Sequence, residues 1–328
     1  IFTLFKGLQL DIGAPPQFMD FRYTVHDRWH GEFHLDHCGA LLDVEPMGED
    51  YVKGMCHDIE DPTFDATALA TNRKAQVRPI HRPPRTPSDQ HPHCRWTVII
   101  DESYPEVPFI PAMDIVAATH AHACELDPID PNDEGMADYS GPLLADVDFG
   151  AFSHSALVRI ADEVCLQMHL LVKSFTIAVE ARAKDDVALA QSVRTKQLIG
   201  IAGVAAERIH KALKLSTDIK GALRVLELHP LLNPAAYVYA DIDPDFVHVR
   251  RSPAYEVSPA ADLPLQAIVQ AVDPHLRAEV SGTESDWTVR VIETDTAAKK
   301  LSEVAVTEFS GGASWVFEDR KSLPLTVV

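Results

Sequence analysis

Residues 96–100 read Trp-Thr-Val-Ile-Ile and residues 287–291 read Trp-Thr-Val-Arg-Val, and these two stretches decide the expected fold. Both are rich in β-branched residues, which is typical of strands that pack against a core. Each follows the same order of patterns: a strand, a turn of small residues, a helix and another strand. This order indicates either an internal duplication that builds two similar units or chance similarity between short β segments.

The segments around both stretches are predicted to mix strands and helices. Alternating apolar residues predict strands, and apolar residues at helical spacing predict helices. The first segment is expected to hold a hairpin of strands at 21–26 and 32–35, helical stretches over 49–70, strands at 76–82 and 95–101, and a helix over 113–125. The second is expected to hold strands at 237–241 and 246–250, a helix over 263–272, and strands at 277–280, 287–293, 302–309 and 314–318.

The middle of the chain predicts two long helices. Residues 152–183 and 185–213 carry apolar residues three and four positions apart, and Ser153 and Asp185 are suitable N-caps. Their short connection favours an antiparallel helical hairpin, and a third helix is expected over 218–228. We therefore expect an α+β fold in which two small α/β units flank an inserted helical hairpin. The expected divisions are an α/β unit with a Cys/His cluster at 1–125, an acidic linker at 126–151, a helical region at 152–234 and a second α/β unit at 235–328.

The charge balance narrows the classes of partner. The 328 residues include 29 Lys and Arg against 49 Asp and Glu, a net charge of −20. This argues against nucleic acid and anionic membrane surfaces, which bind clustered Lys and Arg. Residues 101–150 hold twelve acids and no Lys or Arg. Within them, acids mixed with Pro and Gly predict a solvated linker, the alternative being a docking site for a basic partner. No apolar run is expected to reach the ~18 residues of a membrane span and no signal peptide is evident, so a cytoplasmic protein is expected.

Cysteine placement points to a site in the first hundred residues. Five cysteines, an odd number, predict reduced thiols rather than a disulfide framework. Three of them lie next to histidines, in the pairs His37-Cys38, Cys56-His57 and His93-Cys94. Zinc and iron sites use thiolate and imidazole ligands. The candidate ligands of a single zinc or iron ion are Cys38, Cys56, His57, His93 and Cys94. The alternative is that they are structural residues of strands and helices.

The same residues also suit hydrolysis without a cofactor. In a helix, Cys56 and Glu60 lie one turn apart on one face. Cys56 or Cys94 could act as the nucleophile. His57 or His93 could move the proton, with Glu60 orienting the imidazole.

Cationic side chains cluster in the same segment of this acidic chain. Arg78, His81 and Arg82 lie near the third Cys/His pair in the sequence, and His37 precedes the first cysteine. These four residues are candidates for binding a substrate carboxylate. The arginines can equally neutralise acids of the same domain.

Several of these features together resemble a known family. A strand reaches Cys38, a helical Cys56 is followed by acids, Asn72 precedes a strand, and a later strand opens with His93-Cys94-Arg95-Trp96. Over about residues 30–100 this pattern resembles the L-2-amino-thiazoline-4-carboxylic acid hydrolase-like family. The resemblance implies hydrolytic opening of a C–N bond in a small, cyclic, carboxylate-bearing substrate. The helical hairpin and the C-terminal segment depart from a compact single-domain member.

Three functions are compatible with the sequence. The first is a cytoplasmic hydrolase of a small molecule, which predicts that Cys56, His57, His93 and Cys94 converge on one cleft. The second is a zinc- or iron-dependent enzyme built on the same cluster. The third is a non-catalytic protein for small-ligand binding or assembly, in which the helical hairpin would form a homodimer interface.

Overall fold

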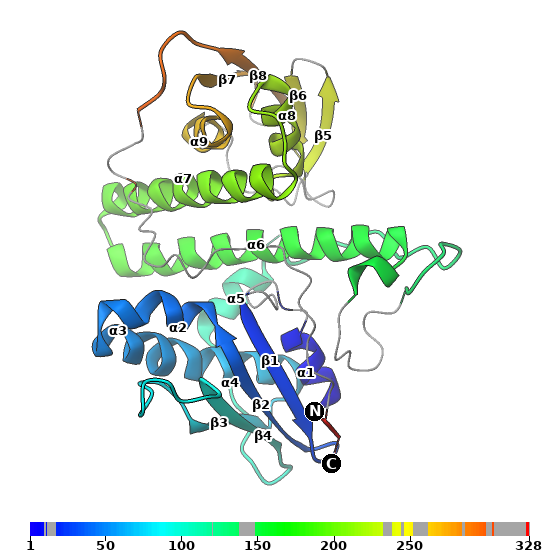
Figure 1. Ribbon diagram of the computed structural model, residues 1–328, viewed down its shortest axis with the longest axis vertical. Coiled ribbons are helices and arrows are strands. Elements are labelled where there is room, and N and C mark those ends of the chain that lie inside the picture. Colours follow the sequence, from blue (N-terminus) through cyan, green and yellow to red (C-terminus); the bar gives the residue numbers. More distant parts are fainter. Residues whose placement is uncertain are drawn as a thin grey trace. The chain divides into compact units, whose positions relative to one another are not determined.

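The computed structural model describes residues 1–9, 11, 18–119, 121–137, 148–231, 238–243, 246–251, 262–283, 286–299, 304 and 326–327. The chain packs as two units (Figure 1). Unit 1 contains the described residues within Ile1–Phe109, Glu134–Ser153 and Thr307–Val328, and unit 2 those within Ile110–Asp133 and His154–Val306. Each unit combines helices with a sheet whose strands are antiparallel, apart from one short parallel pair in unit 1. The predicted α+β class is confirmed.

Unit 1 is built on a five-stranded sheet. Its strands are β1 (Met19–Val25), β2 (His30–Cys38), β3 (Ala75–His81), β4 (Cys94–Ile100) and β9 (Thr326–Val327), in the order β3-β4-β2-β1-β9. The predicted hairpin is confirmed, because β1 pairs antiparallel with β2. Strand β2 is longer than the predicted 32–35 and carries the chain directly to Cys38.

In unit 1, one α-helix precedes β1 and three others lie between β2 and β3 in the sequence. They are α1 (Phe2–Gln9), α2 (Gly39–Val44), α3 (Glu49–Lys53) and α4 (Glu60–Thr71), with 3-10 turns at Glu45–Met47 and Phe149–Ala151 and a π-helical segment at Gly54–Ile59. The predicted helical stretch over 49–70 is thus confirmed, with a π-helical segment inside it. Pro62 is the third residue of α4 and lies inside this continuous helical stretch, shortly after the π-helical segment.

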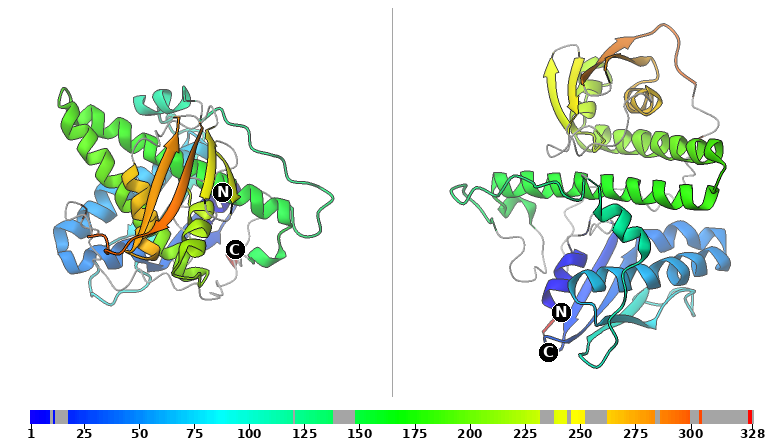
Figure 2. Two further views of the ribbon diagram at one scale, coloured as in Figure 1. Left: turned by 90° about the horizontal axis from the view of Figure 1, so that it is seen from above. Right: turned by 180° about the vertical axis from the view of Figure 1, so that it is seen from behind.

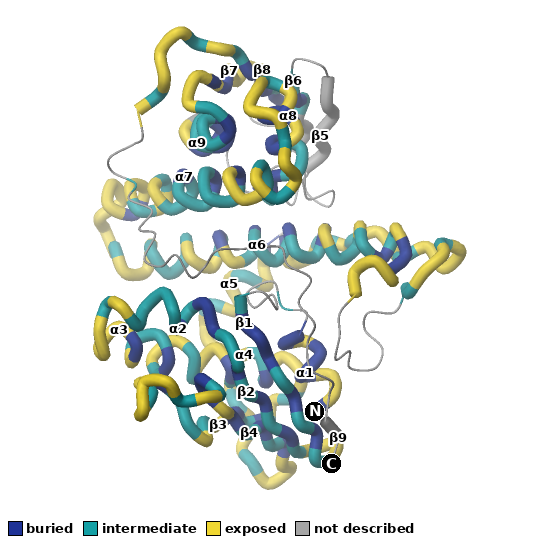
Figure 3. Tube along the Cα trace, in the orientation of Figure 1, coloured by how far each residue is buried: buried dark blue, intermediate teal, exposed yellow. Residues whose placement is uncertain are grey.

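The core of unit 1 lies between the sheet and α4. Phe64 of α4 packs against Phe33 of β2 and Trp96 of β4, with ring centroids 5.1 and 4.8 Å apart. Burial alternates along β2 and β4, so every second side chain enters this core and the others lie on the opposite face (Figure 3). One face of the sheet is therefore apolar and the other polar.

Unit 2 contains the long helices and a second sheet. Its helices are α5 (Pro111–Ala117), α6 (His154–Ala183), α7 (Val187–Ala212), α8 (Ile219–Leu228) and α9 (Asp262–Val272), and its strands are β5 (Val238–Asp243), β6 (Phe246–Arg251), β7 (Leu276–Gly282) and β8 (Asp286–Glu293). The sheet has the order β5-β6-β8-β7 (Figure 2). Residues of α7, α8, α9 and this sheet share one core.

Two details of unit 2 differ from the predictions. The N-cap of α7 is Asp186 rather than Asp185, because the Asp186 carboxylate accepts a hydrogen bond from the Leu189 N–H at 2.9 Å. The helix predicted over 113–125 ends at Ala117. The Ala118 N–H already bonds to the Asp114 carbonyl in the last turn, and Cys124 lies outside any helix.

The two units share one topology. The order β3-β4-β2-β1 corresponds to β7-β8-β6-β5, and a helix precedes β3 and β7 alike. Both helices are followed by the same turn, in which the Ala75 N–H donates to the Asn72 carbonyl and the Leu276 N–H to that of Asp273, at 2.9 and 3.0 Å. This agreement favours duplication over chance similarity of the two segments.

Several predictions are not tested by the described residues. Apart from Val304, the strands predicted at 302–309 and 314–318 lie outside them, as does most of the second half of the acidic linker. The four-part division of the chain, the homodimer and the cytoplasmic location stay predictions. By length and composition α6 could cross a membrane, and a core helix of a soluble protein passes the same test.

Candidate functional site

Three cysteines meet at one small cavity in unit 1. Its volume is about 20 Å³, which is room for roughly one water molecule. Residues that carry thiol, imidazole and carboxyl groups line it from four separate segments, and the surface that they expose to the cavity is apolar. The lining residues are Met19, Leu35, Cys38, Leu41, Met55, Cys56, Glu60, Phe64, Pro83, His93, Cys94 and Trp96.

Secondary structure positions each thiol differently. Cys38 ends β2 and caps α2, its Sγ accepting a hydrogen bond from the Leu41 N–H at 3.4 Å. Cys94 opens β4 directly opposite Leu35 of β2, so the sheet register brings the ends of these two strands together. Cys56 comes from the π-helical segment. The wider turn of a π-helix changes the direction of its side chains relative to a regular α-helix.

Burial dominates the electrostatics of the thiols. It raises the pKa of Cys38 to about 11 and that of Cys56 to about 12, and it raises the pKa of Cys94 well above its usual range. The negative charge of Glu60 adds to the rise for all three thiols, so this carboxyl is their common neighbour. All three thiols are therefore protonated at neutral pH.

The pKa of the Glu60 carboxyl lies near neutral pH. Burial, followed by the charge of Asp61, raises its pKa from 4.5 to about 7. It stands at the first position of α4, directly after the π-helical segment that carries Cys56. A carboxyl with this pKa can both accept and donate a proton at neutral pH.

Among the described residues, His93 contributes the one imidazole in the lining of this cavity. Its side chain is buried, and burial, with Arg85 as the next cause, lowers its pKa to about 4. It is therefore neutral at physiological pH. Its Nδ1 has no hydrogen-bond partner within the described part of the chain. Arg85 in turn forms a two-bonded ion pair with Glu45 at 2.8 Å.

The other predicted histidines do not line the cavity. His57 makes a hydrogen bond of 2.7 Å from Nε2 to the Pro83 carbonyl oxygen, on the loop that follows β3. His81 lies 3.4 Å from the side-chain amide of Gln90. His37 is also absent from the lining. Of the four residues expected to converge, Cys56, His93 and Cys94 come together and His57 lies against the neighbouring loop.

Both predicted carboxylate-binding arginines already pair with acids of α4. Arg78 binds the carboxylate of Asp65 at 2.9 Å in an exposed pair. Arg82 pairs with Asp61, and its guanidinium lies 6.0 Å from the Trp96 ring centroid. Charge neutralisation within the domain is therefore observed for both, and Arg82 is the one that approaches the cavity wall.

Sequence reasoning misses the apolar wall of the site. In a polar cluster outside it, the strand alternation places His30 and Glu32 on one face, but His26 is missed. Trp96 could have been found from its two-residue spacing after Cys94, which puts both on one face of β4. His26, His30 and Glu32 bring their ligand atoms within 4.8 Å of one another. This is the one such group of three among the described residues, so the thiol cavity does not already hold ligand atoms at metal-binding spacing.

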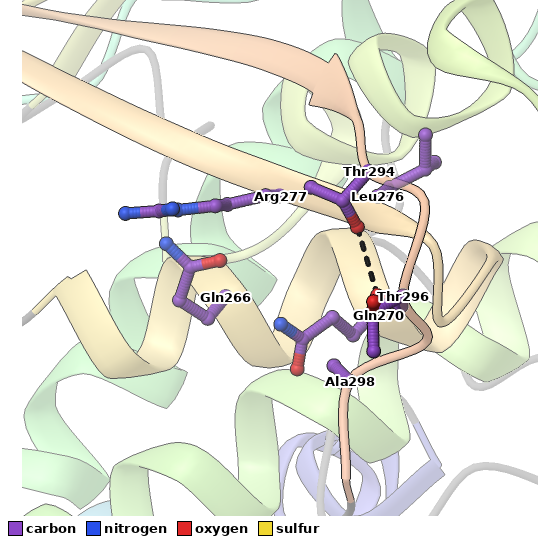
Figure 4. A pocket seen from close by; sticks show the side chains of 7 residues that line it. All are labelled: Gln266, Gln270, Leu276, Arg277, Thr294, Thr296 and Ala298. Carbon is purple, nitrogen blue, oxygen red and sulfur yellow. Dashed lines mark hydrogen bonds between the residues drawn. The ribbon is translucent and has the colours of Figure 1, made fainter.

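Unit 2 has a larger pocket of a different character, of about 410 Å³. It is lined by Gln266, Gln270, Leu276, Arg277, Thr294, Thr296 and Ala298 (Figure 4). Thr294 is engaged with the Thr296 carbonyl at 3.0 Å, and the Gln266 amide with the backbone of Ala278. Among the described residues, this lining includes no thiol, imidazole or carboxylate.

Comparisons of the chain with known protein families, curated proteins and solved structures found no match. Function therefore has to be inferred from the chemistry of the site.

Proposed function

We propose that unit 1 is a thiol-dependent hydrolase that opens a C–N bond of a small, cyclic, carboxylate-bearing substrate. The observation that carries the proposal is the meeting of Cys38, Cys56, Cys94, His93 and Glu60 at one buried cavity. Nucleophile, proton carrier and neutral base are the groups that such a hydrolysis requires.

Cys56 is the best-placed nucleophile of the three thiols. It belongs to a π-helical segment, a feature that occurs frequently at functional sites. The charge of Arg82 acts to lower its pKa, against the larger effect of burial. Cys38, by contrast, is engaged as the cap of α2.

Glu60 accepts and donates the proton in each half of the proposed reaction. The Cys56 thiol gives its proton to the Glu60 carboxylate as Sγ bonds to the electrophilic carbon of the ring. The electron pair of the breaking C–N bond goes to nitrogen, which takes the proton from Glu60. Water then attacks the same carbon and loses a proton to Glu60, the C–S bond breaks, and Cys56 recovers that proton. The net reaction is the addition of one water, and the pKa of about 7 suits Glu60 to both directions of transfer.

Substrate binding requires the cavity to open. A space of about 20 Å³ admits a water molecule but not a ring. Met55 and Pro83 lie in its wall, and Pro83 belongs to the loop between β3 and β4. Arg82 precedes Pro83 and would exchange Asp61 for the substrate carboxylate.

The test is hydrolysis of 2-amino-thiazoline-4-carboxylate by the full chain, followed by mass spectrometry for the gain of one water. Turnover is expected to be lost in Cys56→Ser and to fall by about 10²-fold or more in Glu60→Gln. Cys165→Ser, which changes a buried thiol of α6 in unit 2, is the matched control and should retain activity. No turnover by folded wild-type protein, or full turnover by Cys56→Ser, would contradict the proposal.

A metal-dependent hydrolase is the second candidate. The unpartnered Nδ1 of buried His93 favours it, because imidazole and thiolates bind zinc; a catalytic site would use three of these four groups and leave one position to water. In that case the side chains must first move closer together, since their ligand atoms are not at metal-binding spacing. Activity that disappears on chelation and returns with zinc would select this candidate, whereas activity indifferent to chelation would select the metal-free thiol mechanism.

A further inference from the structure

A second cluster of ligand-type side chains lies at the hairpin end of β1 and β2, apart from the thiol cavity. His26, His30 and Glu32 are half-buried, and their ligand atoms all lie within 4.8 Å of one another. None of them lines the thiol cavity. Glu32 alternates with the buried Gly31 and Phe33, so it projects from the face of the sheet opposite the aromatic core.

The hairpin holds these residues together through its backbone. Val25 pairs with Gly31, and the N–H groups of His26 and Asp27 both donate to the His30 carbonyl at 3.1 Å. The Asp27 carboxylate closes the turn by accepting from the His30 N–H at 2.9 Å. The two imidazole rings consequently lie with centroids 4.5 Å apart.

Neighbouring polar groups orient two of the three side chains. The His30 Nε2 lies 3.2 Å from the Thr97 hydroxyl oxygen, which leaves its other ring nitrogen for a ligand. Arg95 donates through Nε to Glu32 Oε2 at 2.8 Å, while the other oxygen, Oε1, lies 3.5 Å from His26 Nε2. Hydrogen bonds of this kind orient the ligands of metal sites.

One atom of the cluster lacks a hydrogen bond in the present arrangement. His26 Nε2 is buried and makes no well-formed hydrogen bond within the described segments, only a 3.5 Å ion-pair contact with Glu32 Oε1. A buried unsatisfied polar atom calls for an explanation, and an unplaced ion is one of the recognised explanations. A ligand shared by this atom and Glu32 Oε1 would replace that long contact with two bonds.

We propose that His26, His30 and Glu32 bind one divalent transition-metal ion, such as zinc or ferrous iron. Two imidazoles and one carboxylate are a recurrent ligand set for these ions, and three protein ligands leave a coordination position open to water or a small ligand. Arg95 pairs with the second carboxylate oxygen of Glu32, Oε2, and balances its charge. Because the Arg95 side chain is roughly half exposed, it can turn toward solvent when the ion binds. The site needs neither a thiol nor the proposed hydrolase.

Cobalt(II) is the probe that separates this site from the cysteines. The metal-free full chain is titrated with Co²⁺ and followed by absorption spectroscopy, because sulfur ligands add an intense charge-transfer band that nitrogen and oxygen ligands lack. The expected result is about one bound Co²⁺ without that band. Binding of Zn²⁺ is then measured by calorimetry and should weaken by about 10-fold or more in His26→Ala, His30→Ala and, more conservatively, His26→Gln.

His34→Ala is the matched control. His34 lies on β2 two residues beyond Glu32, and its imidazole pairs with Asp36 at 3.5 Å. The His34 variant should bind zinc as the wild type does, and circular dichroism confirms that each variant is folded. Stoichiometry below half an ion, a sulfur charge-transfer band on the only bound ion, or undiminished binding in the folded His26 and His30 variants would overturn the proposal.

Discussion

Replacing Glu60 with glutamine should stabilise unit 1 at alkaline pH and change it little in acid. Burial raises the folded-state pKa of Glu60 from 4.5 to about 7, so between these values the folded chain holds a proton that the unfolded chain has released. Stability of the wild type therefore falls as pH rises through this window and stays low above it. Glutamine carries no proton equilibrium, so the variant should lack this fall.

The magnitude follows from the same two pKa values. At about 1.4 kcal/mol per pH unit, the interval from 4.5 to about 7 corresponds to about 3 kcal/mol. The variant should exceed the wild type by up to this amount at about pH 8 and by nearly nothing at about pH 4. His93, whose lowered pKa has the opposite pH dependence, titrates in both proteins and cancels in the difference.

The assay is urea unfolding at several pH values, read by peptide-resolved hydrogen exchange with every sample pulsed at one pH. Peptides that cover β2 and β4 report unit 1 separately from unit 2. Asp58→Asn, an exposed carboxyl of the same helical stretch, is the control and should show the wild-type pH dependence. Parallel pH profiles for wild type and Glu60→Gln would refute the placement of an ionisable carboxyl in this buried site.

The remaining predictions concern packing and capping. Trp96→Ala removes a side chain that is 1% exposed and should lower the free energy of unfolding of unit 1 by about 3–5 kcal/mol. Trp29→Ala, at an exposed position, is the control and should cost far less. Chemical denaturation of both variants measures the difference, and equal losses would contradict the burial argument. Asp186→Ala should cost about 1 kcal/mol through loss of the α7 N-cap, while Asp185→Ala should be nearly neutral; a reversed order in thermal unfolding would move the cap back to the residue that the sequence favours.

Local periodicity was sufficient for most of the secondary structure. The alternation of Cys94, Trp96 and Val98 predicts both a strand and its buried face, because side chains two apart on a strand share a side. The long helices α6 and α7 were predicted from apolar residues three and four positions apart, because such residues share one face of a helix. The N-cap of α7 was predicted one residue too early, because Asp185 and Asp186 are both good N-caps and the backbone conformation selects between them.

Tertiary structure alone decided which chemical groups meet. The register that sets Leu35 opposite Cys94 brings Cys38 near Cys94 across 55 residues of intervening chain. No tight turn joins these two strands, so turn geometry does not set their register and it is decided when the sheet assembles. The π-helical segment then aims Cys56 at the same cavity, and His57 at the neighbouring loop. The sequence determined the thiols, imidazoles and carboxyl that the first segment carries. Their burial, and with it the raised pKa of Glu60, exists only once sheet and helices pack, because desolvation depends on neighbours brought from distant parts of the chain.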